Sequence, residues 1–85
     1  MWIVRERLTH NGTVLDERKT DTWEAARDSA RNIALRVSDV TTRTERRTWL
    51  QVASYLARRL PRNRPYSKEA FGRELVVEES SEVQE

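Results

Sequence analysis

Residues 2–20 read WIVRERLTHNGTVLDERKT, and this stretch decides how the chain begins to fold. Two β-prone runs, residues 2–8 and 13–20, flank Asn11-Gly12. Asn-Gly between such runs is the strongest short-range signal for a β-hairpin, because a type I′ turn needs a positive φ at both central residues. The stretch therefore predicts a hairpin with a two-residue loop.

The register of this predicted hairpin is less simple than its turn. A two-residue loop places Glu6 opposite Glu17 and Arg5 opposite Arg18, and like charges directly across a strand pair are unfavourable. Diagonal contacts between opposite charges would offset the repulsion, or a β-bulge would shift the register. Either way the outer half of the hairpin is highly charged, so we expect one of its faces to lie in water.

Two amphipathic helices are expected after the hairpin, over residues 22–37 and 43–59. Asp21 and Glu24 form a capping box with Asp21 as the N-cap, and Thr42 and Glu45 form a second one. Pro61 ends the second helix, because proline disfavours the helical conformation of the residue before it. The apolar stripes recur at helical spacing and are Trp23, Ala26, Ala30, Ile33 and Val37 in the first helix, and Trp49, Val52, Ala53, Leu56 and Leu60 in the second.

The last third of the chain is expected to hold one more strand. Residues 61–66 read as a loop, and residues 67–72 as a single helical turn with Ser67 as N-cap and Gly72 as its stop. Residues 73–79 form a strand that pairs with the hairpin. The sequence thus predicts an α+β domain over residues 1–79, β-β-α-α-β in order, with two helices on one face of a three-stranded antiparallel sheet. Residues 80–85 are expected to be a flexible acidic tail.

Composition excludes several classes of protein. The chain has 85 residues, which is enough for one domain, and it contains no cysteine, so neither disulfides nor thiolate zinc sites are expected. No apolar run reaches the roughly 18 residues that a membrane-spanning helix needs. We therefore expect a soluble cytoplasmic protein without a cofactor.

Catalytic groups are not grouped in any recognisable way. The lone histidine, His10, lies beside the predicted turn, where it has neither shelter from water nor a partner for acid–base work. Gly12 and Gly72 are the only glycines, so no glycine-rich phosphate loop exists. A chain this short also leaves little room for a pocket of about 300 Å³ or more. A non-enzymatic protein is the prediction.

Charge is divided along the chain, and this is the feature with functional content. Residues 1–40 sum to zero, residues 41–64 carry seven arginines and Glu45 for a net of +6, and residues 69–85 carry a net of −5. Arginines predominate in protein interfaces and in phosphate contacts, and Tyr66 offers an aromatic anchor beside them. The candidate binding surface comprises Arg43, Arg46, Arg47, Arg58, Arg59, Arg62, Arg64 and Tyr66.

Residues 2–27, with Trp2-Ile-Val-Arg, Asn11-Gly12 and Asp21-Thr-Trp-Glu-Ala-Ala-Arg27, resemble small accessory proteins of phages and prophages from GC-rich actinobacteria. This resemblance implies a protein that acts by docking on a host component. The same stretch is similar to the arm-binding domain of tyrosine recombinases, in which a small sheet with a polar turn precedes a helix. That second resemblance implies contact with DNA.

Two functions therefore remain open at the level of sequence. The first is a binding module, monomeric or dimeric, that docks on another protein, which the absence of catalytic groups and the segregated charge suggest. The second is nucleic-acid binding through the basic helix and the loop after it. A charge map separates them: an acidic C-terminal strand lying over the arginines would remove the second, and an open row of arginines would favour it.

Overall fold

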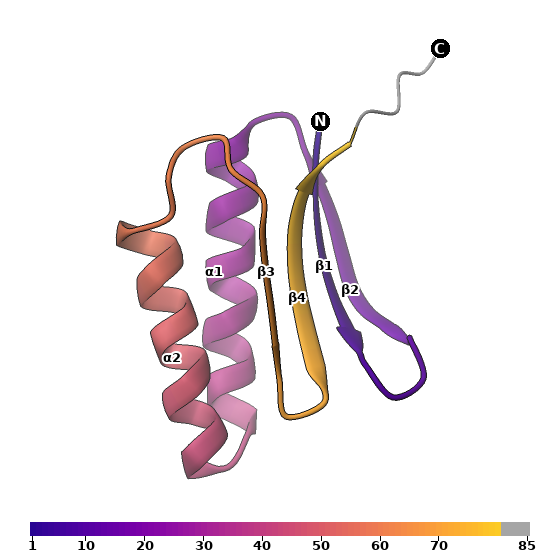
Figure 1. The fold of residues 1–85 in the computed structure, drawn as a ribbon, viewed down its shortest axis with the longest axis vertical. Coiled ribbons are helices and arrows are strands. Elements are labelled where there is room, and N and C mark those ends of the chain that lie inside the picture. The colour runs from indigo at the N-terminus through magenta and orange to yellow at the C-terminus, as the bar shows by residue number, and fades with distance from the viewer. Residues whose placement is uncertain (81–85) are drawn as a thin grey trace.

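A computed structural model describes residues 1–80, which form an α+β fold of two layers, with two helices on one face of an antiparallel sheet (Figure 1). The sheet has four strands, not the predicted three, in the order β2-β1-β4-β3. The elements in chain order are β1 (Trp2–Leu8), β2 (Val14–Thr20), α1 (Trp23–Val40), α2 (Arg43–Arg58), β3 (Tyr66–Ala70) and β4 (Arg73–Glu79).

The first hairpin forms where the sequence predicts it, but its turn is wider than two residues. The Leu8 N–H donates to the Thr13 carbonyl over 2.8 Å, and the Gly12 N–H donates to the Leu8 carbonyl over 2.9 Å. Gly12 has a φ of 73°, whereas Asn11 is not among the residues of positive φ, and its side-chain oxygen accepts from the Thr13 N–H. The type I′ prediction at this turn was therefore wrong.

A bulge corrects the unfavourable register of the β1–β2 pair. The register shifts between Glu6 and Arg7, which places Arg5 opposite Glu17. The Arg5 guanidinium then donates to the Glu17 carboxylate over 2.7 Å. At Arg5, opposite charges face each other where a two-residue loop would have set like charges. The same register places Glu6 opposite Asp16, and Arg36 offsets this repulsion by pairing with both carboxylates.

The fourth strand, β3, occupies residues that were predicted as loop and helical turn. Ser67 is not an N-cap and Gly72 does not stop a helix. Phe71 and Gly72 have φ values of 54° and 76° and link Ala70 to its partner Arg73. Positive φ at both central residues of a two-residue loop is the signature of a type I′ hairpin. Residues 66–79 are therefore a second hairpin, whose strand β4 pairs with β1.

The helices begin close to their predicted capping boxes. Thr22, not Asp21, is the N-cap of α1, and its hydroxyl accepts from the Ala25 N–H over 3.1 Å. Thr42 caps α2 as predicted, by accepting from the Glu45 N–H over 3.5 Å. The helix α1 extends three residues beyond the predicted end, and α2 ends one residue before it.

The core lies between the helices and one face of the sheet. The helix α1 lies against β1, β2 and β4, whereas α2 packs on α1 and contacts the sheet only at β3. Burying this apolar surface is the main force that holds so short a chain together. The buried apolar side chains are Trp2, Val4, Trp23, Ala26, Ala30, Ile33, Ala34, Val37, Trp49, Val52, Ala53, Leu56, Leu75 and Val77.

One charged side chain lies inside this core. Glu6 on β1 is 1% exposed, and its two carboxylate oxygens accept from Arg36 of α1 and from Arg73 of β4, the latter over 2.7 Å. Arg36 also donates to Asp16 over 3.1 Å, as does Arg18. A carboxylate this deep needs such partners, because an unpaired buried charge is strongly unfavourable.

The predicted tail, residues 80–85, lies outside the described residues except for Ser80. The Ser80 N–H donates to the Met1 carbonyl over 2.8 Å, which extends the β1–β4 pairing by one step. Within residues 1–80, neither helix is long and apolar enough to cross a membrane.

Candidate functional site

Arginines of the sheet and of α1 are largely neutralised by nearby carboxylates. Arg7 donates to Glu74 over 2.6 Å, and Arg5 contacts both Glu17 and Glu78. Of the sixteen Lys and Arg side chains, seven form an ion pair with a partner in the described part of the chain. These seven are Arg5, Arg7, Arg18, Arg27, Arg36, Arg62 and Arg73.

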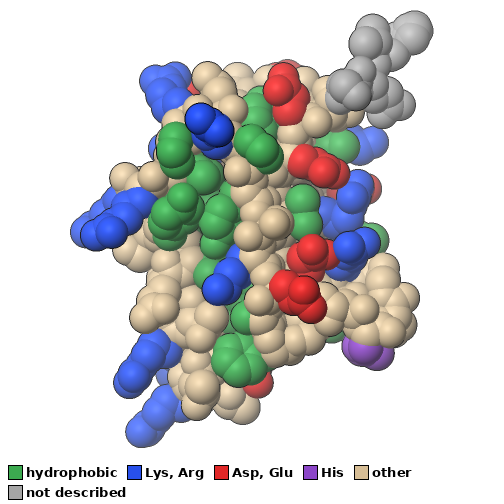
Figure 2. Space-filling view, viewed as in Figure 1, with side chains coloured by type: hydrophobic (Ala, Val, Ile, Leu, Met, Phe, Trp, Pro, Cys, Tyr) green, Lys and Arg blue, Asp and Glu red, His purple; other side chains and the backbone are tan. Residues whose placement is uncertain are grey.

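Four arginines on α2 have neither an ion pair nor a side-chain hydrogen bond within residues 1–80, and a fifth, Arg46, has no ion pair there but bonds a backbone carbonyl. Arg43, Arg47, Arg58 and the C-cap residue Arg59 are all exposed, and no ion pair within residues 1–80 includes them. We call these four residues the α2 arginine surface. Figure 2 shows Lys and Arg side chains along the edge of the molecule that α2 forms, while Asp and Glu gather over the sheet side.

The acidic C-terminal strand does not cover these arginines. The strand β4 lies between β1 and β3, and its Glu74 and Glu78 face the sheet arginines Arg7 and Arg5. The strand β3 separates β4 from α2, so the carboxylates of β4 neutralise the sheet and leave α2 basic.

The other predicted surface residues have structural contacts. Arg46 donates to the Ser38 carbonyl over 3.0 Å, which ties the start of α2 to the end of α1. Arg62 pairs with Glu24 at the start of α1. The Arg64 carbonyl accepts from the indole N–H of Trp23 over 3.1 Å, and this bond anchors the loop before β3. Of the eight predicted residues, Arg46 and Arg62 thus have side-chain partners, whereas Arg64 is held through its backbone.

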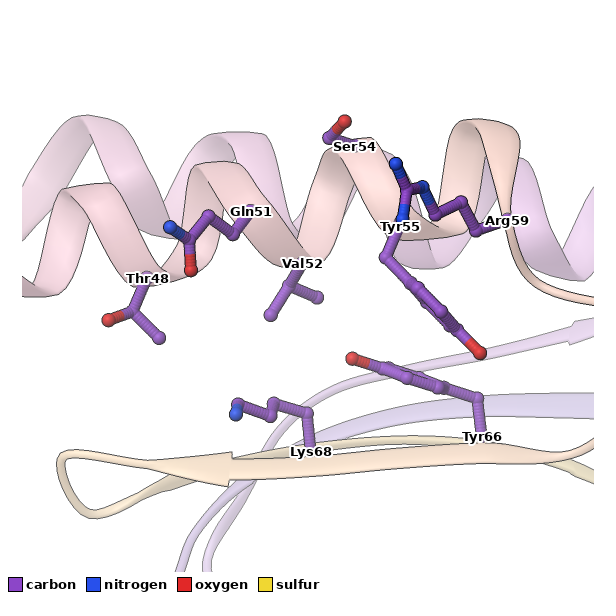
Figure 3. Close-up of a pocket in the computed structure, with 8 residues that line it drawn as sticks. All are labelled: Thr48, Gln51, Val52, Ser54, Tyr55, Arg59, Tyr66 and Lys68. Atoms are coloured by element: carbon purple, nitrogen blue, oxygen red, sulfur yellow. The ribbon is translucent and has the colours of Figure 1, made fainter.

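A groove of about 450 Å³ lies between α2 and β3 (Figure 3). It exists because α2 contacts the sheet only at its β3 edge. Its volume exceeds the roughly 300 Å³ for which so short a chain was expected to have little room, although this groove is open to solvent. The lining residues are Thr48, Gln51, Val52, Ser54, Tyr55, Arg59, Tyr66 and Lys68.

Two tyrosines form an aromatic wall of the groove. The rings of Tyr55 and Tyr66 are stacked, with centroids 5.4 Å apart and planes 28° from parallel. Burial, and secondarily the nearby Tyr55, raises the pKa of Tyr66 above its usual value of 10.0, so this phenol stays neutral at physiological pH. The Tyr55 side chain is more open, with 36% of the residue exposed.

The charge in this groove is entirely positive. Arg59 and Lys68 line it, neither is ion-paired within residues 1–80, and no carboxylate is among the lining residues. Figure 3 shows Arg59 on the helix side near Tyr55 and Lys68 on the strand side below Gln51 and Val52.

Sequence reasoning found Arg59 and Tyr66 but missed Tyr55 and Lys68. A signal for Tyr55 was present, because residues 48, 52, 55 and 59 recur at steps of four, three and four and so share one helix face beside the apolar stripe. Lys68 was hidden by the wrong assignment of residues 67–72 to a helical turn.

A shallower hollow of about 380 Å³ lies on the outer face of α2, around Leu50. Leu50 is 44% exposed, and Arg43, Arg46 and Arg47 surround it together with Gln51 and Ser54. A leucine ringed by arginines is an apolar spot with a charged rim.

Comparison of the chain with protein-family models, with curated proteins and with solved structures finds no match in any of the three.

Proposed function

We propose that this protein binds nucleic acid through the α2 arginine surface. The observation that supports the proposal is the contrast in pairing: arginines on the sheet have carboxylate partners, and the four on α2 have none in residues 1–80. An unpaired, exposed guanidinium presents a planar fork of donors that matches phosphate oxygens.

The spacing of these arginines suits a polyanion. Arg43 and Arg58 are fifteen residues apart on one helix, which at roughly 1.5 Å per residue separates them by about 22 Å. A chain of phosphates offers several successive contacts over that length, whereas a small anion offers one. The overall net charge is only +2, so binding depends on this local surface and not on the charge of the whole chain.

Salt dependence tests the proposal. Four phosphate contacts predict a slope of about −2.8 in log K against log salt for a single strand and about −3.6 for a duplex. Raising the salt from about 50 mM to about 200 mM should therefore weaken binding by roughly 50- to 150-fold. We expect the double variant Arg43→Gln, Arg47→Gln to lose about half of this slope.

A matched control is available on the sheet. The double variant Arg5→Gln, Arg7→Gln removes the same charge from residues that are already paired with carboxylates. Fluorescence anisotropy with a labelled oligonucleotide should show near-normal binding for this control. Equal losses in both double variants would mean that only net charge matters, and no binding at about 50 mM salt would end the proposal.

Docking on another protein is the second candidate, and the exposed Leu50 favours it. Arginine is enriched in interface hot spots, and the buried centre of an interface is more apolar than its rim. A phage-type accessory protein that docks on a host component would use this patch. Leu50→Ser should then abolish capture of one defined host protein while leaving oligonucleotide binding unchanged.

A further inference from the structure

We infer that the groove between α2 and β3 holds an unpaired nucleobase, so that the nucleic acid bound is single-stranded. This inference rests on the proposed function and names its substrate class. Three features that meet in one hollow support it: an aromatic wall, two cations that have no ion pair within residues 1–80, and polar side chains at the rim.

The shape of the groove selects against paired bases. Its opposing walls come from α2 and from β3, and its volume is about 450 Å³. A base inside a duplex is covered on both faces by its neighbours, so it cannot enter a hollow between two walls without being unstacked. A base of a single strand is free to do so.

The aromatic wall offers a surface on which a base can stack. Tyr55 and Tyr66 are already stacked on each other, so their rings are held in place, and Tyr55 keeps more than a third of its surface exposed. A ring that is fixed before binding loses little freedom when a base stacks on it. Stacking of this kind tolerates any sequence, because every base has a flat π-face.

The cations accommodate the backbone on either side of that base. Arg59 lies on the helix side of the groove and Lys68 on the strand side, and no carboxylate of residues 1–80 lines the hollow. Arg59 also belongs to the α2 arginine surface, so a strand whose base enters the groove continues onto Arg58 and the rest of that surface. The groove thus adjoins the α2 arginine surface at Arg59.

The rim can contact the edge of the base. Gln51 and Thr48 project from α2 above the groove, and both lack a side-chain hydrogen bond to the described residues. An unpaired base exposes the donors and acceptors that a complementary strand would otherwise occupy. An amide such as that of Gln51 satisfies a donor and an acceptor together.

The test compares a labelled 12-nucleotide DNA strand with its 12-base-pair duplex by fluorescence anisotropy. The wild type should bind the single strand more tightly than the duplex at the same salt. Tyr55→Leu should weaken single-strand binding by about 5- to 150-fold, the range that base–aromatic stacking supplies, with little change for the duplex. Tyr55→Phe keeps the ring and should stay within about threefold of wild type.

A second variant covers the case in which Tyr55→Leu disturbs the helix. Lys68→Gln leaves the tyrosine stack intact and should lower the single-strand salt slope by about 0.7. Equal affinity for strand and duplex, or a Tyr55→Leu variant that binds both as wild type does, would overturn the groove inference and leave the α2 proposal standing. Failure of the wild type to bind either DNA would overturn both.

Discussion

Replacing Glu6 by Gln should destabilise the fold more than any other removal of a single charge from the sheet. The variant keeps the shape of the side chain but loses its negative charge, while Arg36 and Arg73 still face it. An amide has one acceptor oxygen, so one of the two guanidinium groups meets an NH₂ donor where it met a carboxylate oxygen.

The size of the effect follows from the burial of Glu6. Each charge-assisted hydrogen bond contributes roughly 1.5–3 kcal/mol, and Glu6 accepts two of them at 1% exposure. The Gln variant retains part of one of these two hydrogen bonds. The Arg36 side chain is half exposed, so its guanidinium can form hydrogen bonds with water instead. The net loss should be about 2–4 kcal/mol, a large share of the roughly 4–12 kcal/mol expected for a chain of this length.

The assay is urea unfolding followed by tryptophan fluorescence, since Trp2, Trp23 and Trp49 are all buried. Glu17→Gln is the matched control, because it removes the same charge from the neighbouring strand at an exposed pair with Arg5, which contributes only about 0–1 kcal/mol. The two variants should differ by at least 1 kcal/mol at an unchanged m-value. Equal losses would mean that the buried cluster contributes no more than a surface pair, and the reasoning would be wrong.

Two further predictions concern the same sheet. Burial alone would raise the pKa of Asp16, but hydrogen bonds and charge from Arg18 and Arg36 outweigh it and lower that pKa below the ordinary 3.8. A lowered carboxylate pKa contributes stability that is fully present above the unfolded pKa and is lost as the pH falls through the folded pKa. Asp16→Asn should therefore be less stable than wild type at pH 7, and the difference should shrink as the pH falls below 3.8. A constant difference in urea titrations across this range would contradict the assignment. Phe71→Asn should stabilise the second hairpin by about 0.5–1 kcal/mol in the same unfolding assay. Asn tolerates a positive φ, and the Phe71 side chain packs little because the residue is 54% exposed. A loss of stability would show that the ring packs more than its exposure indicates.

The helices could be predicted from sequence because several local signals agree there. Apolar stripes at helical spacing and capping residues at Thr42 and Glu45 all indicate the same elements. The N-cap of α1 was misplaced by one residue because Asp21 and Thr22 are both competent caps. Packing decides between them, since Trp23 is buried and its indole N–H bonds the Arg64 carbonyl.

The strand β3 could not be predicted because its signals are not local. Its inward-facing residues are Tyr66, Lys68 and Ala70, of which none is fully buried, so no apolar alternation marks it. Ser67 and Gly72 are residue types that occur both at helix ends and in hairpin turns, so they do not distinguish the two structures. Pairing with β4 selects the hairpin, and that pairing is visible only when the sheet is assembled. The groove was missed for the same reason, since one of its walls is this strand.

The placement of charge at the start of α2 argues that its arginines are not there for the fold. Arginine in the first turn of a helix opposes the macrodipole at a cost of roughly 0.3–1 kcal/mol when it is exposed, and this effect falls off beyond that turn, so it is strongest for Arg43. Arg46 is compensated by its bond to the Ser38 carbonyl, but Arg43 and Arg47 have no such bond within residues 1–80. In the sheet, by contrast, the carboxylates of Glu6 and Asp16 both pair with Arg36. Under the proposed function, a phosphate backbone would supply the negative charge that Arg43 and Arg47 lack within residues 1–80, and it would continue past Arg58 to the groove beside Arg59.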